Sequence, residues 1–223
     1  CDIVSWGVMV EAYAQCGDCL NAVQLFEKMQ LHGIEPNASI FVSVLKACSS
    51  NIQQGRQIHE QVIRCGFHTD KTVCNALIDM YVKCGLILEA QDVFDKLPVR
   101  DVVTWNVLIA GYIRYDFTLE ALKCYDRMEV DGISPDAYTF AFVLKACGTM
   151  RNLKMGEEIH SSITKQGLVE NDIVLGTALV DMYCKCGALE EAQQVFHKLP
   201  IRNIVSWNAL ITGYTHYGMY DEA

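Results

Sequence analysis

One segment recurs three times along the chain. The stretch "RDVVTWNVLIAGY" at residues 100–112 has near-copies in "CDIVSWGVMVEAY" at the start and "RNIVSWNALITGY" at residues 202–214. The copies lie about a hundred residues apart. Self-similarity at a fixed spacing is the sequence signature of a repeat architecture, and it constrains the fold more than any local propensity.

A finer period lies inside the long one. An alanine followed four residues later by an aromatic residue recurs at Ala22/Phe26, Ala90/Phe94, Ala121/Tyr125 and Ala192/Phe196. Two further units, beginning at Ala38 and Ala137, carry a glycine and a histidine in place of this pair. Each long period therefore contains three units of different type.

These units come in a long, a middle and a short form, in an order that occurs twice and then starts again. We place them at residues 3–37 (long), 38–70 (middle), 71–101 (short), 102–136 (long), 137–172 (middle), 173–203 (short) and 204–223 (truncated long).

Each unit is expected to form two helices. In the long units the first helix is predicted to follow a hydroxyl cap at Ser5, Thr104 or Ser206, and then to be apolar at 3–4-residue spacing. Glycines such as Gly17, Gly85 and Gly187 are expected to end first helices, where a left-handed residue is needed. A hairpin this short cannot bury its own apolar face, so neighbouring hairpins must stack. The sequence predicts an all-α, right-handed superhelical α-solenoid.

Composition narrows the classes of function that the chain could have. Half of the residues (51%) are hydrophobic, but no apolar run approaches the roughly 18 residues of a membrane span, so we expect no membrane partner. The chain has neither an initial methionine nor a targeting segment, and it is interpreted as a fragment. The formal charge of −9 argues against nonspecific attraction to nucleic acid, although it does not exclude a local basic stripe.

The 11 cysteines follow the repeat. Cys48 and Cys147 occupy equivalent places, which suggests small buried residues in a reducing compartment rather than a disulfide framework. The segment "CGDC" at residues 16–19 has the CxxC spacing of zinc and redox sites, but no second CxxC completes a zinc site. We therefore expect no metal and no cofactor.

The pattern "VTWNVLIAGY…EALKCYDRM…GISPD" resembles the pentatricopeptide repeat. Its alternation with "LKAC…GxxIH" units and with short units such as "ALVDMYCKCGALEEAQQVF" looks like the PLS subclass (P long, L middle, S short) of land plants. The resemblance covers essentially the whole chain. It implies sequence-specific binding of single-stranded RNA, one base per repeat, within a chloroplast or mitochondrial factor for C-to-U RNA editing or RNA processing.

In such factors a separate domain with H-x-E and P-C-x-x-C zinc motifs performs the deamination. That pair of motifs is absent from this sequence. We therefore expect binding without catalysis, and no small-molecule substrate.

The resemblance also implies which residues read bases. The fifth residue of each unit and the residue that closes the unit together meet one base. The fifth residues that could do so are Gly7, Asn75, Asn106, Thr177 and Asn208, and the closing ones are Asn37, Asp101, Asp136 and Asn203. The family's pairing assigns U to Asn75 with Asp101 and to Asn106 with Asp136, A to Thr177 with Asn203, and a weak purine preference to Gly7 with Asn37. For Asn106 and Asn208, a simple role in starting a helix is the alternative.

In the middle units the fifth residues are Val42 and Ala141, which are apolar, so direct readout there is doubtful.

Two further sets accompany the readers. Valines at the second place of four units are expected to clamp the base, although packing would also explain them: Val4, Val103, Val174 and Val205. A basic column near the ends of first helices is expected to contact phosphates: Lys83, Arg114 and Lys185, with His216 at the same place in the last unit. The three tryptophans are expected in the core.

A protein-interaction scaffold is the alternative function. In this case the groove would take a peptide or an accessory RNA-editing protein, and the acidic charge favours it. An enzyme is the least favoured class, because the sequence shows no nucleophile–base pair, metal set or phosphate loop at workable spacing.

Overall fold

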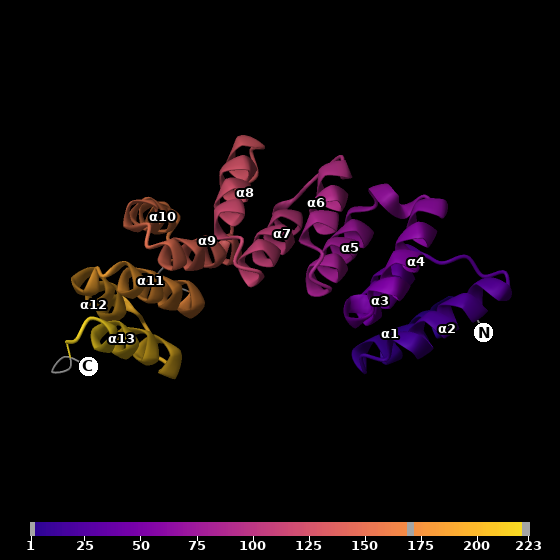
Figure 1. The fold of residues 1–223 in the computed structure, drawn as a ribbon, viewed down its shortest axis with the longest axis horizontal. Coiled ribbons are helices and arrows are strands. Elements are labelled where there is room, and N and C mark those ends of the chain that lie inside the picture. The colour runs from indigo at the N-terminus through magenta and orange to yellow at the C-terminus, as the bar shows by residue number, and fades with distance from the viewer. Residues whose placement is uncertain (1–2, 169–171, 220–223) are drawn as a thin grey trace. The chain divides into compact units, whose positions relative to one another are not determined.

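The computed structural model describes residues 3–168 and 172–219. Within these ranges there are thirteen α-helices, two short 3₁₀ segments and no strand, which confirms the all-α prediction (Figure 1). Residues 169–171 of the expected 137–172 unit, and 220–223 of the 204–223 unit, lie outside the described residues.

The chain divides into two compact units, Cys1–Gly111 and Tyr112–Ala223. The N-terminal unit contains α1 (Ile3–Gln15), α2 (Cys19–Leu31), α3 (Ala38–Ala47), α4 (Ile52–Arg64), α5 (Lys71–Lys83), α6 (Ile87–Lys96) and most of α7 (Val102–Arg114). The C-terminal unit contains α8 (Thr118–Val130), α9 (Ala137–Met150), α10 (Leu153–Lys165), α11 (Ile173–Cys186), α12 (Leu189–Lys198) and α13 (Ile204–His216).

Helices pair into hairpins, and the first helices of successive hairpins lie side by side. In the N-terminal unit α1 contacts α3 and α3 contacts α5; in the C-terminal unit α9 contacts α11 and α11 contacts α13. Each unit thus presents a surface made by first helices alone. That surface carries the residues expected to read bases.

The first helices begin earlier than the predicted hydroxyl caps. Thr104 and Ser206 lie inside the first turn and are buried, and the backbone N–H of each donates to the preceding closing residue. Asp101 and Asn203 are therefore the caps, and the hydroxyl-cap prediction was wrong for these helices. Ser5 likewise lies within α1.

The predicted glycine ends are confirmed. Gly17, Gly85 and Gly187 follow first helices with φ of 70°, 80° and 80°, in the left-handed region that a Cβ disfavours.

In the short hairpins, stacking on the next hairpin rests on the aromatic residue of the second helix. Phe94 of α6 packs on Trp105 of α7, and Phe196 of α12 packs on Trp207 of α13, with ring centroids 4.6 Å apart in both cases. The alanine four residues before each phenylalanine is fully buried, so the helices can approach there. Trp6 and Trp105 lie in the core as expected, whereas Trp207 is 48% exposed, so that prediction was wrong for Trp207.

No helix in the described part of the chain is long and apolar enough to cross a bilayer.

Candidate nucleic-acid interface

The fifth residues stand one turn into the first helices and are all at least partly exposed. Two of them hold unsatisfied polar atoms: Asn75 Oδ1 on α5 and Thr177 Oγ1 on α11 are buried and make no hydrogen bond with the residues described. An unpaired buried polar atom costs about 1–3 kcal/mol. Rotation of these side chains toward a ligand with a polar edge would remove that cost at both places.

The closing residues cap the next first helix. Asn37 Oδ1 accepts from Ile40 N at 3.0 Å, and Asn203 Oδ1 accepts from Ser206 N at 2.9 Å. Because an amide nitrogen cannot accept a hydrogen bond, the cap fixes which way each amide points and directs Nδ2 to another partner. The helix-start role considered for Asn106 and Asn208 therefore belongs to the closing residues.

The aspartates cap in the same way. Asp136 Oδ1 accepts from the backbone N of Thr139 and from its hydroxyl, both at 2.9 Å. Asp101 Oδ1 accepts from Thr104 N at 3.0 Å, while its Oδ2 pairs with Lys71 Nζ at 2.6 Å. Burial opposes ionisation, but the hydrogen bonds from Lys71 and Thr104 hold the pKa of Asp101 below its ordinary value. Asp101 is thus an ionised acceptor at neutral pH.

The four clamp valines are strongly exposed. Val4, Val103, Val174 and Val205 leave between 51% and 67% of their surface uncovered, so they do not pack in the core. Tyr138 occupies the same second place in its hairpin and is 70% exposed. Sequence reasoning missed this aromatic side chain, although aligning the second residue of every unit would have found it.

In the N-terminal unit the structure brings the first pair of readers together. A pocket of about 530 Å³ is lined by Gly7, Asn37 and Val4, along with Glu11 and Ser43. A Cβ at Gly7 would meet Ile40 at an ordinary 3.7 Å, so packing does not require glycine there. The Ser43 hydroxyl donates to Glu11, and this hydrogen bond lowers the pKa of the carboxyl group. Sequence reasoning missed this negative charge.

In the C-terminal unit, Thr177 and Asn208 line a second pocket of about 420 Å³. Val174 and Val205 form part of its wall, so two expected readers and two expected clamps face one cavity. Ala141, the fifth residue of the middle hairpin, also lines this cavity. The cavity therefore combines small polar atoms with exposed aliphatic surface, which suits the edge and face of a flat heterocycle.

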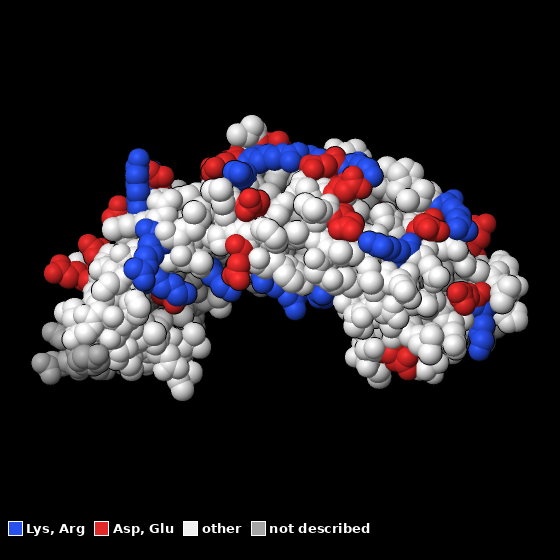
Figure 2. Space-filling view, in the orientation of Figure 1, with Lys and Arg blue, Asp and Glu red and all other residues white. Residues whose placement is uncertain are grey.

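The basic column is partly neutralised. Lys83 pairs with Asp79 at 2.7 Å and Lys185 with Asp181 at 2.6 Å, each within its own helix. Arg114, the third member, is exposed at the end of α7. Exposed pairs of this kind contribute about 0–1 kcal/mol, so the lysines can exchange partners readily. Figure 2 shows basic and acidic residues interspersed on the face it presents, in keeping with the acidic net charge.

The "CGDC" segment does not form a metal site in the structure. Cys19 Sγ lies 3.4 Å from Cys48 Sγ in the core, whereas Cys16 is exposed. Across the described residues, no three His, Cys, Asp or Glu side chains are placed to hold a metal ion.

Comparison with known families gives matches along the chain. A profile described as the PPR repeat family matches residues 100–149, and a PPR repeat profile matches residues 4–34, 72–102, 177–204 and 205–223.

Similar full-length proteins come from Arabidopsis thaliana. One pentatricopeptide repeat-containing protein is 41% identical over 222 residues, covering 99% of this chain and 30% of the relative. A chloroplastic relative is 35% identical (95% of this chain, 25% of the relative) and a mitochondrial one is 34% identical (100% and 27%). The chain therefore spans less than a third of the length of these relatives.

Solved structures share the fold. The pentatricopeptide repeat protein PPR10 in complex with an 18-nucleotide psaJ RNA element matches with a TM-score of 0.81 at 20% identity, covering 100% of this chain and 34% of that one. PPR10 from maize matches with a TM-score of 0.62 at 17% identity, covering 99% and 37%. The α-solenoid prediction is confirmed.

Proposed function

The chain belongs to the pentatricopeptide repeat family, and from this we propose that it binds single-stranded RNA with base specificity through its first helices. The observation that carries the proposal is the pair of unsatisfied reader atoms, Asn75 Oδ1 and Thr177 Oγ1, at the places where a base would meet the chain. In this proposal the RNA base supplies the missing partner, as one base per repeat requires.

The closing residues supply the discriminating group. Asn203 uses Oδ1 for its cap, so its Nδ2 donates to the unprotonated ring nitrogen of adenine. Asp101 is an acceptor only, and it selects the ring N–H of uracil beside Asn75. The same chemistry assigns U to Asn106 with Asp136. Gly7 offers no side-chain group, so with Asn37 it reads a purine weakly.

The exposed valines would cover the faces of the bases, and Lys83, Arg114 and Lys185 would contact phosphates. The biological setting is part of the proposal: the chain serves as a PLS-type recognition tract of a chloroplast or mitochondrial RNA-editing or RNA-processing factor. Chloroplastic and mitochondrial relatives support the location. Accessory RNA-editing proteins are proposed further partners, and we assign no catalytic role to this tract.

A single substitution tests the reading mechanism. Asn203→Asp keeps an oxygen for the helix cap but replaces the donor with an acceptor, which suits the ring N–H of guanine rather than adenine. The bases are numbered by the hairpins proposed to read them, counted from the N-terminus, so Asn75 and Asp101 read the third base and Thr177 and Asn203 the sixth. With RNAs that differ only at the sixth base, fluorescence anisotropy should show a shift from A toward G by about 1 kcal/mol.

The matched control is Asp172→Asn, a change at the cap of α11 whose hairpin partner, Ala141, has no polar group. It should leave base preference unchanged at every position. Equal weakening of all RNAs by Asn203→Asp would mean that Asn203 only caps a helix, and the proposed reading would be wrong.

A further inference from the structure

A third pocket lies beside the readers of the C-terminal unit. It measures about 390 Å³ and is lined by residues of α9, α11 and α13 and by the turn that follows α9. Arg151, Lys185 and His216 are among its lining residues, so three nitrogen-bearing side chains that can carry positive charge face one cavity. The pocket shares Asp181, Ala209 and Thr212 with the pocket of Thr177 and Asn208. The two cavities are therefore adjacent along the same helices.

The side chains that line this pocket carry more positive than negative charge. Asp181 is the carboxylate on its lining, and it already pairs with Lys185 at 2.6 Å. Arg151 makes no ion pair with any carboxylate among the described residues. Its Nη2 lies 3.4 Å from His216 Nε2, and because a guanidinium only donates, the imidazole nitrogen must accept. Cys184 also lines the cavity, and burial raises the pKa of its thiol to about 12, so it adds no negative charge.

The backbone holds Arg151 in this position at a cost. Arg151 ends α9 in the left-handed conformation with φ of 53°, where a residue with a Cβ is disfavoured. Its N–H donates to Gly148 O, and the next residue, Asn152, caps α10. Glycine or asparagine would relieve this backbone strain, but the sequence has arginine at this position.

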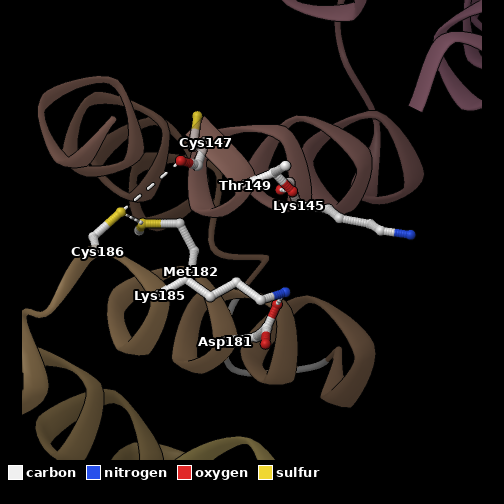
Figure 3. A network of polar contacts seen from close by, with 7 residues as sticks. All are labelled: Lys145, Cys147, Thr149, Asp181, Met182, Lys185 and Cys186. Atoms are coloured by element: carbon white, nitrogen blue, oxygen red, sulfur yellow. Dashed lines mark hydrogen bonds and ion pairs between the residues drawn. The ribbon is translucent and has the colours of Figure 1, made fainter. Parts of the chain in front are cut away.

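The glycine at position 148 lets Lys185 lie across the pocket. Gly148 on α9 has no side chain, and a Cβ there would come within 3.1 Å of Lys185 Cδ and 3.3 Å of Met182 Cα. Figure 3 shows Lys185 extending between α9 and α11 toward Asp181, with Lys145 and Thr149 on the facing helix. The Thr149 hydroxyl donates to Lys145 O, whereas the charged groups of Arg151 and Lys185 each have more N–H donors than the contacts described above use.

The corresponding turn in the N-terminal unit differs. From Cys48 to Gly55 the chain has two residues fewer than from Cys147 to Gly156, and the segment Ser49–Ser50–Asn51 contains no arginine. The extra residues lengthen α9, which runs to Met150 whereas α3 ends at Ala47, and Arg151 follows directly on this longer helix.

We propose that the pocket of Arg151, Lys185 and His216 binds one phosphodiester group of single-stranded RNA, with Arg151 as a ligand supplied by the end of the lengthened helix α9. The inference rests on the proposed RNA binding. A base held at Thr177 lies in the adjoining cavity, so its backbone phosphate falls within reach of the second one. The guanidinium offers paired donors to the phosphate oxygens, and His216 orients it.

The test uses the whole 223-residue chain and the variant Arg151→Gly, because glycine adopts the same left-handed backbone without strain. Anisotropy titrations should show roughly tenfold weaker binding of RNA, and a salt dependence shallower by about 0.7 in log–log slope. Lys154→Ala, which removes the same charge from the exposed surface of α10 outside the pocket, is the matched control and should bind like the wild type.

Methylphosphonate substitution locates the contact. RNAs with one neutral linkage at successive positions should include a single one that weakens wild-type binding about as much as Arg151→Gly does. For that RNA the variant should lose nothing further. Additive losses at every linkage would place Arg151 outside the phosphate contact and overturn the proposal.

Titration with inorganic phosphate distinguishes a site for the RNA backbone from a site for free anions. Binding of phosphate that depends on Arg151, together with unchanged RNA affinity in Arg151→Gly, would show a site for free anions and overturn the RNA assignment. Failure of the wild-type chain to bind any RNA would instead overturn the proposed function itself.

Discussion

The hairpins α3–α6 and α9–α12 can be compared residue by residue, because the same contacts recur in each unit. His59 Nδ1 lies 2.8 Å from Tyr81 Oη, and His160 Nδ1 lies 2.8 Å from Tyr183 Oη, with the two rings of each pair inclined at 72°. Arg100 donates to Phe94 O and Arg202 to Phe196 O, at 3.1 and 3.2 Å. The contacts that space the helices are thus duplicated.

The exposed first turns differ between the same hairpins. Asn75 on α5 corresponds to Thr177 on α11, and the ion pair of Lys71 with Asp101 corresponds to Ile173 with Asn203. In the middle hairpins Ser39 corresponds to Tyr138. The duplicated contacts fix where a side chain stands, and under the proposed function the variable residues decide what it can bind. Four predictions test this division between scaffold and reading surface.

The largest effects are expected from the scaffold. Phe94→Ala and Phe196→Ala each remove a buried ring packed on a tryptophan, and each should lower the free energy of unfolding by about 3–5 kcal/mol. Phe94→Ala should lie at the upper end, because Trp105 is fully buried whereas Trp207 is 48% exposed. Urea denaturation followed by circular dichroism measures both. A cost below about 1 kcal/mol at either site would contradict the stacking role of these rings.

The next effect concerns the middle hairpins. Tyr138→Ser should weaken RNA binding by about 1–3 kcal/mol, because an exposed aromatic face beside a small apolar reader can stack a base of any type. The reciprocal change, Ser39→Tyr, should strengthen binding by a similar stacking contact. Anisotropy with RNAs that vary only at the fifth base should show the Tyr138 loss for all four bases alike. A loss confined to one base would indicate hydrogen bonding instead.

A smaller effect is expected in the pH dependence of the free energy of unfolding. Burial, assisted by the charges of Lys96 and Lys198 respectively, lowers the pKa of His59 and His160 from the ordinary 6.5. The folded state thus favours neutral imidazoles, so the unfolded chain binds more protons as pH falls below about 6.5. The stability they contribute is present above that pH and is lost as pH falls through the lowered folded values.

The double variant His59→Asn, His160→Asn should flatten this dependence between pH 7 and pH 5. Asparagine keeps an acceptor near the position of Nδ1, and the tyrosine hydroxyls remain protonated because burial raises the pKa of Tyr81, and that of Tyr183 to about 12. Thermal unfolding across this pH range provides the measurement. An unchanged slope would mean that other groups titrate.

The sequence predicted the all-helical solenoid because its signals are local and repeated. Alanine opposite an aromatic ring and glycine in a left-handed turn require no knowledge of distant contacts. The caps were misassigned because both a hydroxyl and an acidic or amide residue stand at each helix start, and only the backbone geometry shows that Asp101 and Asn203 accept the N–H. Trp207 was wrongly expected in the core, because a repeated position does not by itself show how much of a side chain is covered.

The candidate site was less accessible to sequence reasoning. The expected reader positions came from the resemblance to a repeat family, whereas the partners of Lys83 and Lys185 depend on helix geometry. Glu11 in the first pocket corresponds to Ala110 and Thr212 in the other long hairpins, and Arg151 after α9 has no counterpart in the other middle hairpin, so the repeat pattern did not mark them.

The smallest effect is expected from Lys71→Ile, which replaces Lys71 with the residue type of its counterpart, Ile173. Lys71 and Asp101 are both partly exposed, so loss of their ion pair should change the free energy of unfolding by less than about 1 kcal/mol. The informative change is in base preference. Asp101 Oδ1 is committed to Thr104, and Oδ2 accepts from Lys71. A uracil N–H must therefore share Oδ2 with the ammonium group.

Removing the ammonium leaves that oxygen to the base alone. Preference for U over C at the third base should then rise by a few fold, under about 1 kcal/mol, while affinity for all RNAs falls slightly with the lost charge. The reciprocal variant Ile173→Lys faces Asn203, which has no carboxylate, so preference for A at the sixth base should not move. If the U-to-C ratio is unchanged in Lys71→Ile, Asp101 does not read the base, and the difference between the two hairpins concerns helix capping alone.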